Sequence, residues 1–118
     1  SYYHLGNQDK AINMLSKYVS STDSPLRGDL YILGVCYYNK GNIYMQLKLW
    51  PEAIKAYTQA IKLHVDYAEA YYNRGVAYIL SGDYASGIPD LSRAGEMGLY
   101  KAYNLIKRYR DKAATEVE

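Results

Sequence analysis

The feature that most constrains this sequence is a pattern that recurs after 34 residues. Pairs that are identical at this offset include Tyr37/Tyr71, Tyr38/Tyr72, Asn39/Asn73, Gly41/Gly75, Tyr44/Tyr78, Ile54/Ile88 and Ala60/Ala94. A fixed period of this length indicates an array of supersecondary units, each with an apolar face that a neighbouring unit must cover.

Each unit reads as two helices joined by a turn. Tyr71, Gly75 and Tyr78 are spaced i, i+4 and i+7, so they share one helix face. Gly75 has no side chain, and we therefore expect a neighbouring helix to approach closely there. Gly82 suits the end of this first helix and Asp83 suits the N-cap of the next one.

This pattern resembles the tetratricopeptide repeat (TPR). The residues that carry the resemblance are Tyr71, Gly75, Tyr78, Gly87, Leu91 and Ala94, preceded by Tyr37, Gly41, Tyr44, Ala53, Tyr57 and Ala60. The sequence departs from the family where Lys40 and Arg74 replace its usual Leu, and where Val65 and Leu99 replace its usual Pro. The resemblance implies an all-α fold in which antiparallel helix pairs stack into a superhelical solenoid.

We expect a single TPR-like domain over residues 1–118. Its expected parts are an incomplete first repeat and loop (1–28), a second repeat with an elongated first helix (29–67), a third repeat (68–98) and a C-terminal capping helix (99–118). The join before the last helix resembles the Sel1-like variant of this repeat class. The incomplete first repeat suggests that this chain is a piece of a longer array.

The N-terminal half holds two local expectations. Gly6-Asn7 predicts a turn before a helix from Gln8 to about Ser20, and the polar stretch from Ser20 to Gly28 predicts a loop. The repeat signature then fits twice, seven residues apart, which predicts one long helix from about Asp29 to Lys48. The alternative ends this helix near Lys40, with a turn at Gly41-Asn42.

Prolines and glycines predict the remaining boundaries. Pro51 suits the first turn of a helix that runs to about His64. Pro89 lies inside a helical pattern and predicts a kink or a late start. Gly95 and Gly98 should end that helix before the last one, expected over Leu99–Ala114.

Composition and isolated reactive residues argue against catalysis and several kinds of ligand. The net charge of +2 is too small to indicate a nucleic-acid partner, and we see no membrane-spanning run or signal peptide. His4 and His64 are isolated, and the single Cys36 is expected to be a small buried hydrophobe. We therefore expect a non-enzymatic, cytoplasmic protein with no cofactor and no metal.

The resemblance implies a partner peptide or helix on a concave face lined by the first helix of each repeat. By position, the candidate partner-binding residues are Tyr38, Asn39, Asn42, Tyr72, Asn73, Val76 and Lys107. Some members of the family clamp a C-terminal carboxylate, and Asn42, Asn73 and Lys107 match three of its five positions. Tyr38 and Tyr103 stand where that clamp has lysines.

Two alternatives to a peptide site stay open. Tyr38, Tyr72 and Val76 could simply pack against adjacent helices. The chain could also be a structural segment of a longer solenoid, or associate with itself through the apolar stripe of the incomplete first repeat.

Overall fold

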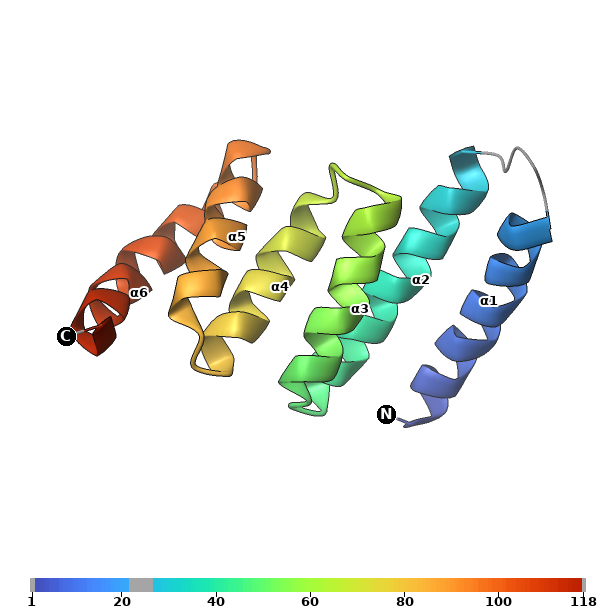
Figure 1. Ribbon diagram of the computed structural model, residues 1–118, viewed down its shortest axis with the longest axis horizontal. Coiled ribbons are helices and arrows are strands. Elements are labelled where there is room, and N and C mark those ends of the chain that lie inside the picture. The colour runs from blue at the N-terminus through green and yellow to red at the C-terminus, as the bar shows by residue number, and fades with distance from the viewer. Residues whose placement is uncertain (1, 22–26, 118) are drawn as a thin grey trace. The chain divides into compact units, whose positions relative to one another are not determined.

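The computed structural model describes residues 2–21 and 27–117, and every element in these ranges is an α-helix (Figure 1). The helices are α1 (Tyr2–Ser21), α2 (Arg27–Gln46), α3 (Trp50–Leu63), α4 (Ala68–Leu80), α5 (Tyr84–Glu96) and α6 (Lys101–Val117). The predicted all-α fold of antiparallel helix pairs is confirmed.

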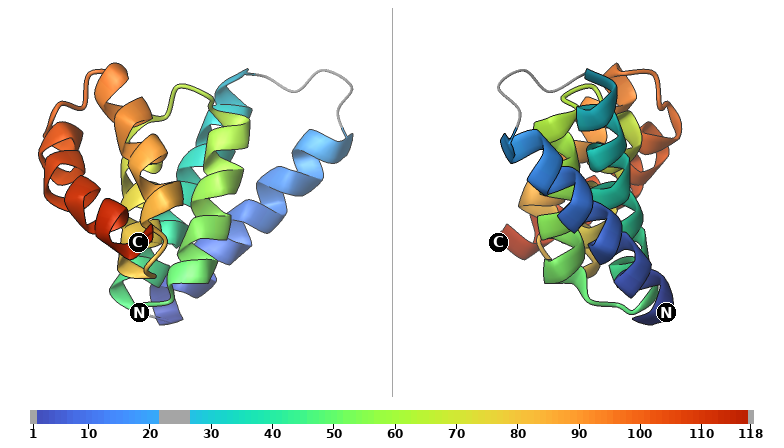
Figure 2. Two further views of the ribbon diagram at one scale, coloured as in Figure 1. Left: turned by 60° about the vertical axis from the view of Figure 1, so that its left-hand side comes forward. Right: turned by 90° about the vertical axis from the view of Figure 1, so that its right-hand side faces the viewer.

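The chain divides into two compact units, Ser1–Val65 and Asp66–Glu118. In the first unit α2 packs against both α1 and α3. In the second unit α5 packs against both α4 and α6 (Figures 1 and 2). Each unit therefore contains one helical hairpin of the predicted kind, together with one further helix. A single domain over the whole chain stays a prediction.

The predicted turn at Gly6-Asn7 is wrong, because α1 runs through both residues without interruption. Both are exposed, so their weak helix propensity, about 1 kcal/mol against Ala for the glycine, is the only local penalty. The helix is stabilised by packing, since Ile12 is buried in the first unit. Of the expected loop over Ser20–Gly28, residues 22–26 lie outside the described residues, and the residues on either side belong to helices.

The predicted long helix is confirmed, because α2 continues through Gly41-Asn42 to Gln46. Lys48 then adopts a left-handed backbone with φ of 59°, which turns the chain. Pro51 lies in the first turn of α3, where its missing N–H has no helical partner to lose.

The second hairpin has the predicted turn. Gly82 has a φ of +96°, and the Asp83 carboxylate accepts a hydrogen bond from the Ser86 N–H at 3.1 Å. Of the two alternatives at Pro89, the late helix start is wrong, since α5 begins at Tyr84 and carries the proline on its exposed side. The kink stays a prediction. Gly98, with a φ of +102°, follows the end of α5 as expected.

The helices of each hairpin are in close contact at a glycine. A Cβ atom on Gly75 would lie 2.9 Å from the Gly87 carbonyl oxygen, which confirms the predicted close contact. A Cβ atom on Gly41 would lie 2.5 Å from the ring of Tyr57, a fully buried side chain. The same glycine position therefore admits backbone in one hairpin and an aromatic ring in the other.

Candidate functional site

Three predicted site residues lie on one face of α2. At 100° per residue, Tyr38, Asn39 and Asn42 fall within a single sector of the helix, and each is half-buried. The Tyr38 ring contacts the Tyr57 ring, with centroids 5.8 Å apart at 48°. The Tyr57 hydroxyl donates a hydrogen bond to Oδ1 of Asn42, which holds this amide in a defined orientation. We call these three residues the α2 face.

The corresponding residues of the second unit are Tyr72, Asn73 and Val76, which we call the α4 face. All three are half-buried, and Tyr72 and Val76 pack against the core cluster formed by Ile79, Leu91, Ala94 and Ala102. The Lys101 ammonium lies 4.6 Å from the centroid of the Tyr72 ring, a cation–π contact that joins α6 to α4.

Within each unit, the structure brings together some of the predicted partner-binding residues but not all of them. Tyr38 and Asn42 meet at Tyr57, and Tyr72 and Val76 meet at one core cluster. Lys107 is exposed on α6. Packing thus accounts for part of the surface of Tyr38, Tyr72 and Val76, as the alternative interpretation expected. Their role in partner binding stays a prediction.

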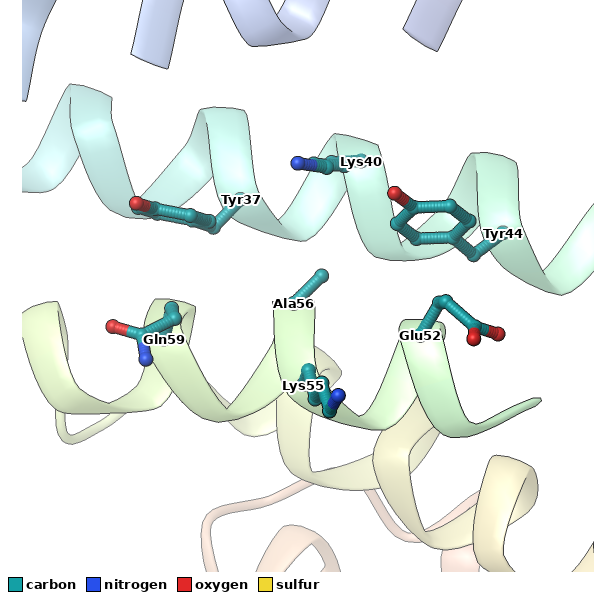
Figure 3. A pocket seen from close by; sticks show the side chains of 7 residues that line it. All are labelled: Tyr37, Lys40, Tyr44, Glu52, Lys55, Ala56 and Gln59. Carbon is teal, nitrogen blue, oxygen red and sulfur yellow. The ribbon is translucent and has the colours of Figure 1, made fainter. Parts of the chain in front are cut away.

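A cleft that the sequence did not predict lies between α2 and α3. It has a volume of about 190 Å³, and Figure 3 shows Tyr37, Lys40 and Tyr44 along one wall. The opposite wall consists of Glu52, Lys55, Ala56 and Gln59. Tyr37, Lys40 and Tyr44 lie on the side of α2 opposite to the α2 face, since the two sets are about half a turn apart. The cleft is therefore a separate surface.

The two hairpins differ in how they pair the cation that lies at the position of Lys40 in the first hairpin. The Lys40 ammonium lies 2.7 Å from a carboxylate oxygen of Asp9 on α1. Burial lowers the pKa of Lys40, but the hydrogen bond and charge of Asp9 outweigh it, so the net pKa is raised. The ammonium is thus held in its charged form at one wall of the cleft.

In the second hairpin, Arg74 occupies the position of Lys40 and Asp90 that of Ala56. The guanidinium pairs with both carboxylate oxygens of Asp90, at 2.7 and 2.8 Å. Both side chains are largely buried, with 18% and 10% of their surfaces exposed. The arrangement of Arg74 and Asp90 is the signal that could have pointed to the cleft, because Lys40 and Ala56 leave that pair incomplete.

Other reactive groups form no recognisable catalytic arrangement in the described part of the chain. Cys36, expected to be a small buried hydrophobe, is a half-buried free thiol, and burial raises its pKa. His64 caps the C-terminal end of α3, with its ring 4.9 Å from that of Tyr31. Residues 2–21 and 27–117 contain no cluster of three potential metal ligands and no helix long and apolar enough to cross a membrane.

Comparison with known families identifies the repeat. Residues 41–82, from the C-terminal third of α2 to the turn after α4, match the family model described as TPR repeat. The fold is TPR-like. The matched segment includes Gly41, Tyr57 and Gly75, the residues at the close contacts of the two hairpins.

Several curated proteins contain a similar segment. Serine/threonine-protein phosphatase 5 of Homo sapiens is 37% identical over 78 residues, which are 66% of this chain and 15% of that protein. Hsp70-Hsp90 organizing protein 1 of Glycine max is 38% identical over 58 residues, or 49% of this chain and 10% of that protein. The chain thus spans a small part of the length of these relatives.

Two solved structures have the same fold. The crystal structure of MamA has a TM-score of 0.63 at 23% identity, covering 92% of this chain and 80% of that one. The first TPR of Spaghetti (RPAP3), bound to the HSP90 peptide SRMEEVD, has a TM-score of 0.67 at 23% identity. That match covers 96% of this chain and 85% of that one.

Proposed function

We propose that the chain is a non-catalytic protein-interaction module in which each unit presents one binding face to a partner segment, the α2 face in the first unit and the α4 face in the second. The observation that carries this proposal is a pair of half-buried asparagines, Asn39 and Asn73, at equivalent positions of the two hairpins. An asparagine amide can both donate to and accept from a peptide backbone. Tyr38 and Tyr72 beside them offer rigid aromatic surface, which is common at binding hot spots.

The comparisons support a peptide as the partner. A TPR of the same fold binds a peptide of sequence SRMEEVD, and a relative of similar sequence is named as an organizer of Hsp70 and Hsp90. The phosphatase match covers 15% of that enzyme and lends no support to catalysis by this chain. We also propose that the join between α5 and α6 is of the Sel1-like variant of the repeat.

Capture of a terminal carboxylate is the less favoured mode. Asn42, Asn73 and Lys107 could serve it, but Tyr38 and Tyr103 replace the lysines of the clamp. The Asn42 amide oxygen is also engaged by the Tyr57 hydroxyl. We therefore propose that backbone groups and side chains along the peptide contribute more than its terminal charge.

Titration of a labelled SRMEEVD peptide, with a free or an amidated C-terminus, tests this proposal. Asn73→Ala should weaken binding by about 1–2 kcal/mol without changing helicity, because it removes amide contacts from a half-buried surface position. Tyr72→Ala should weaken binding by a similar amount, but it should also lower stability because this ring packs against the core. Amidation and Lys107→Ala should have small effects.

The opposite pattern would identify a carboxylate clamp. Binding that is lost on amidation, with Lys107→Ala or at raised salt would contradict the backbone mode. Equal binding by the wild-type chain and by Asn39→Ala, Asn73→Ala and Tyr72→Ala variants would place the partner on a different surface.

Self-association is a second candidate function, favoured by exposed apolar side chains of the first unit. Met14 on α1 is 74% exposed, and Tyr31 and Ile32 on α2 are each 51% exposed. Sedimentation at increasing concentration should reveal a dimer that Ile32→Asp dissociates if this surface joins two copies. A chain that stays monomeric across that range rejects the candidate.

A further inference from the structure

We infer that the cleft between α2 and α3 is a second binding site, which takes the carboxylate of a glutamate or aspartate side chain from a partner protein. This site is distinct from the α2 face, because Lys40 and the two tyrosines beside it lie on the opposite side of the same helix.

The second hairpin supplies the template for this ligand. There, Asp90 places a carboxylate against the cation of Arg74, sixteen residues earlier in the chain. In the first hairpin the same spacing joins Lys40 to Ala56. The cation is retained, but the carboxylate is replaced by a methyl group. The resulting space beside Ala56 is part of the cleft seen in Figure 3.

The groups that line the cleft favour an anion. Tyr37, Tyr44 and Gln59 carry hydrogen-bond donors, Lys40 and Lys55 carry positive charge, and Glu52 is the only acid among the seven lining residues. Asp9 engages Lys40 from α1, but an ammonium group has three hydrogens to donate. The lining therefore offers two cations and several neutral donors against one acid, and Asp9 is the carboxylate that a ligand would have to share Lys40 with.

The size of the cleft favours a side chain over a free small molecule. Ligand pockets usually enclose roughly 300–1,000 Å³, whereas this cleft measures about 190 Å³ and is open to solvent. An acidic side chain presented on a partner backbone fits this space, and the partner would cover the open side.

Paired peptides can test the site on the whole chain. The probes are acetyl-Ser-Gly-Leu-Glu-Leu-Gly-Ser-amide and its Glu→Gln twin, whose blocked termini leave the side chain as the only carboxylate. The glutamate peptide should shift the backbone NMR resonances of Ala56, Lys55 and Gln59, and it should bind at least about tenfold more tightly than its twin.

Three variants and one control then assign the binding to the cleft. Ala56→Asp introduces the carboxylate that the second hairpin already has and should abolish binding, and Lys40→Arg/Ala56→Asp should do the same with the complete pair restored. Lys55→Gln should weaken binding several-fold, whereas Lys62→Gln, an equal loss of charge elsewhere on α3, should not. Circular dichroism identifies any variant that fails to fold, and Lys55→Gln, at an exposed position, provides the test in that case.

Equal affinity for the two peptides would overturn the proposal. So would wild-type affinity in the folded Ala56→Asp or Lys55→Gln variants, or resonance shifts confined to the α2 face. Resonance shifts confined to the α2 face would mean that the acidic peptide binds there, on the surface already proposed for the partner segment. The proposed function would then stand without the second site.

Discussion

The hairpins α2–α3 and α4–α5 share a repeat pattern but fill their interiors differently. In the first, the space beside Gly41 is occupied by the Tyr57 ring, and its cation Lys40 pairs with a different helix, α1. In the second, Gly75 meets the Gly87 backbone, and the cation Arg74 pairs within the hairpin. The pattern thus specifies where two helices meet, while the side chains at variable positions decide what fills the contact.

This difference has a consequence for the surface. The second hairpin is closed by its own ion pair, whereas in the first the lysine pairs with Asp9 on α1 and lines a cleft. A repeat can therefore gain a binding site through the loss of one internal carboxylate, with no change to its helices. Substitutions at equivalent positions should therefore change stability differently in the hairpin that is closed by its ion pair and in the hairpin that keeps a cleft.

The largest effect is expected at the backbone contact of the second hairpin. Gly75→Leu should destabilise the chain by more than about 3 kcal/mol, because the new side chain meets the Gly87 carbonyl oxygen and the Leu91 side chain. Gly6→Ala is the control, since a Cβ atom there would meet nothing within 4 Å, and it should raise stability slightly. Thermal and urea unfolding measure both. An unchanged midpoint for Gly75→Leu would refute the close contact.

The next effect concerns the two ion pairs. Asp90→Asn should lower the free energy of unfolding by about 2–3 kcal/mol, because it leaves the largely buried Arg74 without its counter-charge. Asp9→Asn should lower it by less than about 1 kcal/mol, because Asp9 is 44% exposed and water replaces much of the interaction. Equal losses in urea titrations of the two variants would mean that the hairpins do not differ in this respect.

The repeat period was sufficient to predict the helix pairs, the length of α2 and the close contact at Gly75. It could not predict that α1 passes through Gly6-Asn7, because burial of Ile12 outweighed the local turn preference. Nor could it decide between a kink and a late helix start at Pro89, where α5 in fact begins five residues earlier, at Tyr84. These outcomes depend on tertiary packing, about which the local propensities of residues carry no information.

The binding surfaces were less accessible to sequence reasoning. Asn39 and Asn73 were proposed as binding residues because they repeat, and the structure places both at half-buried positions of α2 and α4. The cleft was missed because it results from a side chain that is absent at Ala56. Only comparison of that position with Asp90, through the pairing with Arg74, makes the absence visible.

A smaller effect is expected at the proline of α5. Pro89 and Lys55 occupy equivalent positions, and only the lysine can donate its backbone N–H to the preceding helical turn. Pro89→Ala should stabilise the chain by about 1 kcal/mol, the net value of one hydrogen bond, because the side chain is exposed and the missing backbone hydrogen bond is restored. Lys55→Ala, the matched change in α3, should alter the unfolding midpoint little. A destabilised Pro89→Ala variant would show that the proline has a packing role.

The smallest effect is a difference in alkaline stability between the two cations. The pKa of Lys40 is raised above its ordinary value of 10.5 in the folded chain, with the effect of Asp9 outweighing burial. Its contribution is therefore complete below about pH 10.5 and is lost as the pH rises through the higher folded-state pKa. Arg74 stays charged throughout this range, since its high pKa is raised further by the hydrogen bond to Asp90.

Urea unfolding between pH 8 and pH 11.5 should reveal this difference. The gap in stability between wild type and Lys40→Gln, below about 1 kcal/mol at pH 8, should close as the lysine loses its proton. The gap in stability between wild type and Arg74→Gln should persist, because the arginine stays charged across this range. Tyrosine ionisation affects wild type and variant alike, so it cancels in each comparison. A Lys40→Arg variant should retain its advantage over Lys40→Gln at high pH. If the Lys40→Gln gap stays constant across the range, the Asp9 contact does not stabilise the chain, and the first hairpin orients its lysine by some other means.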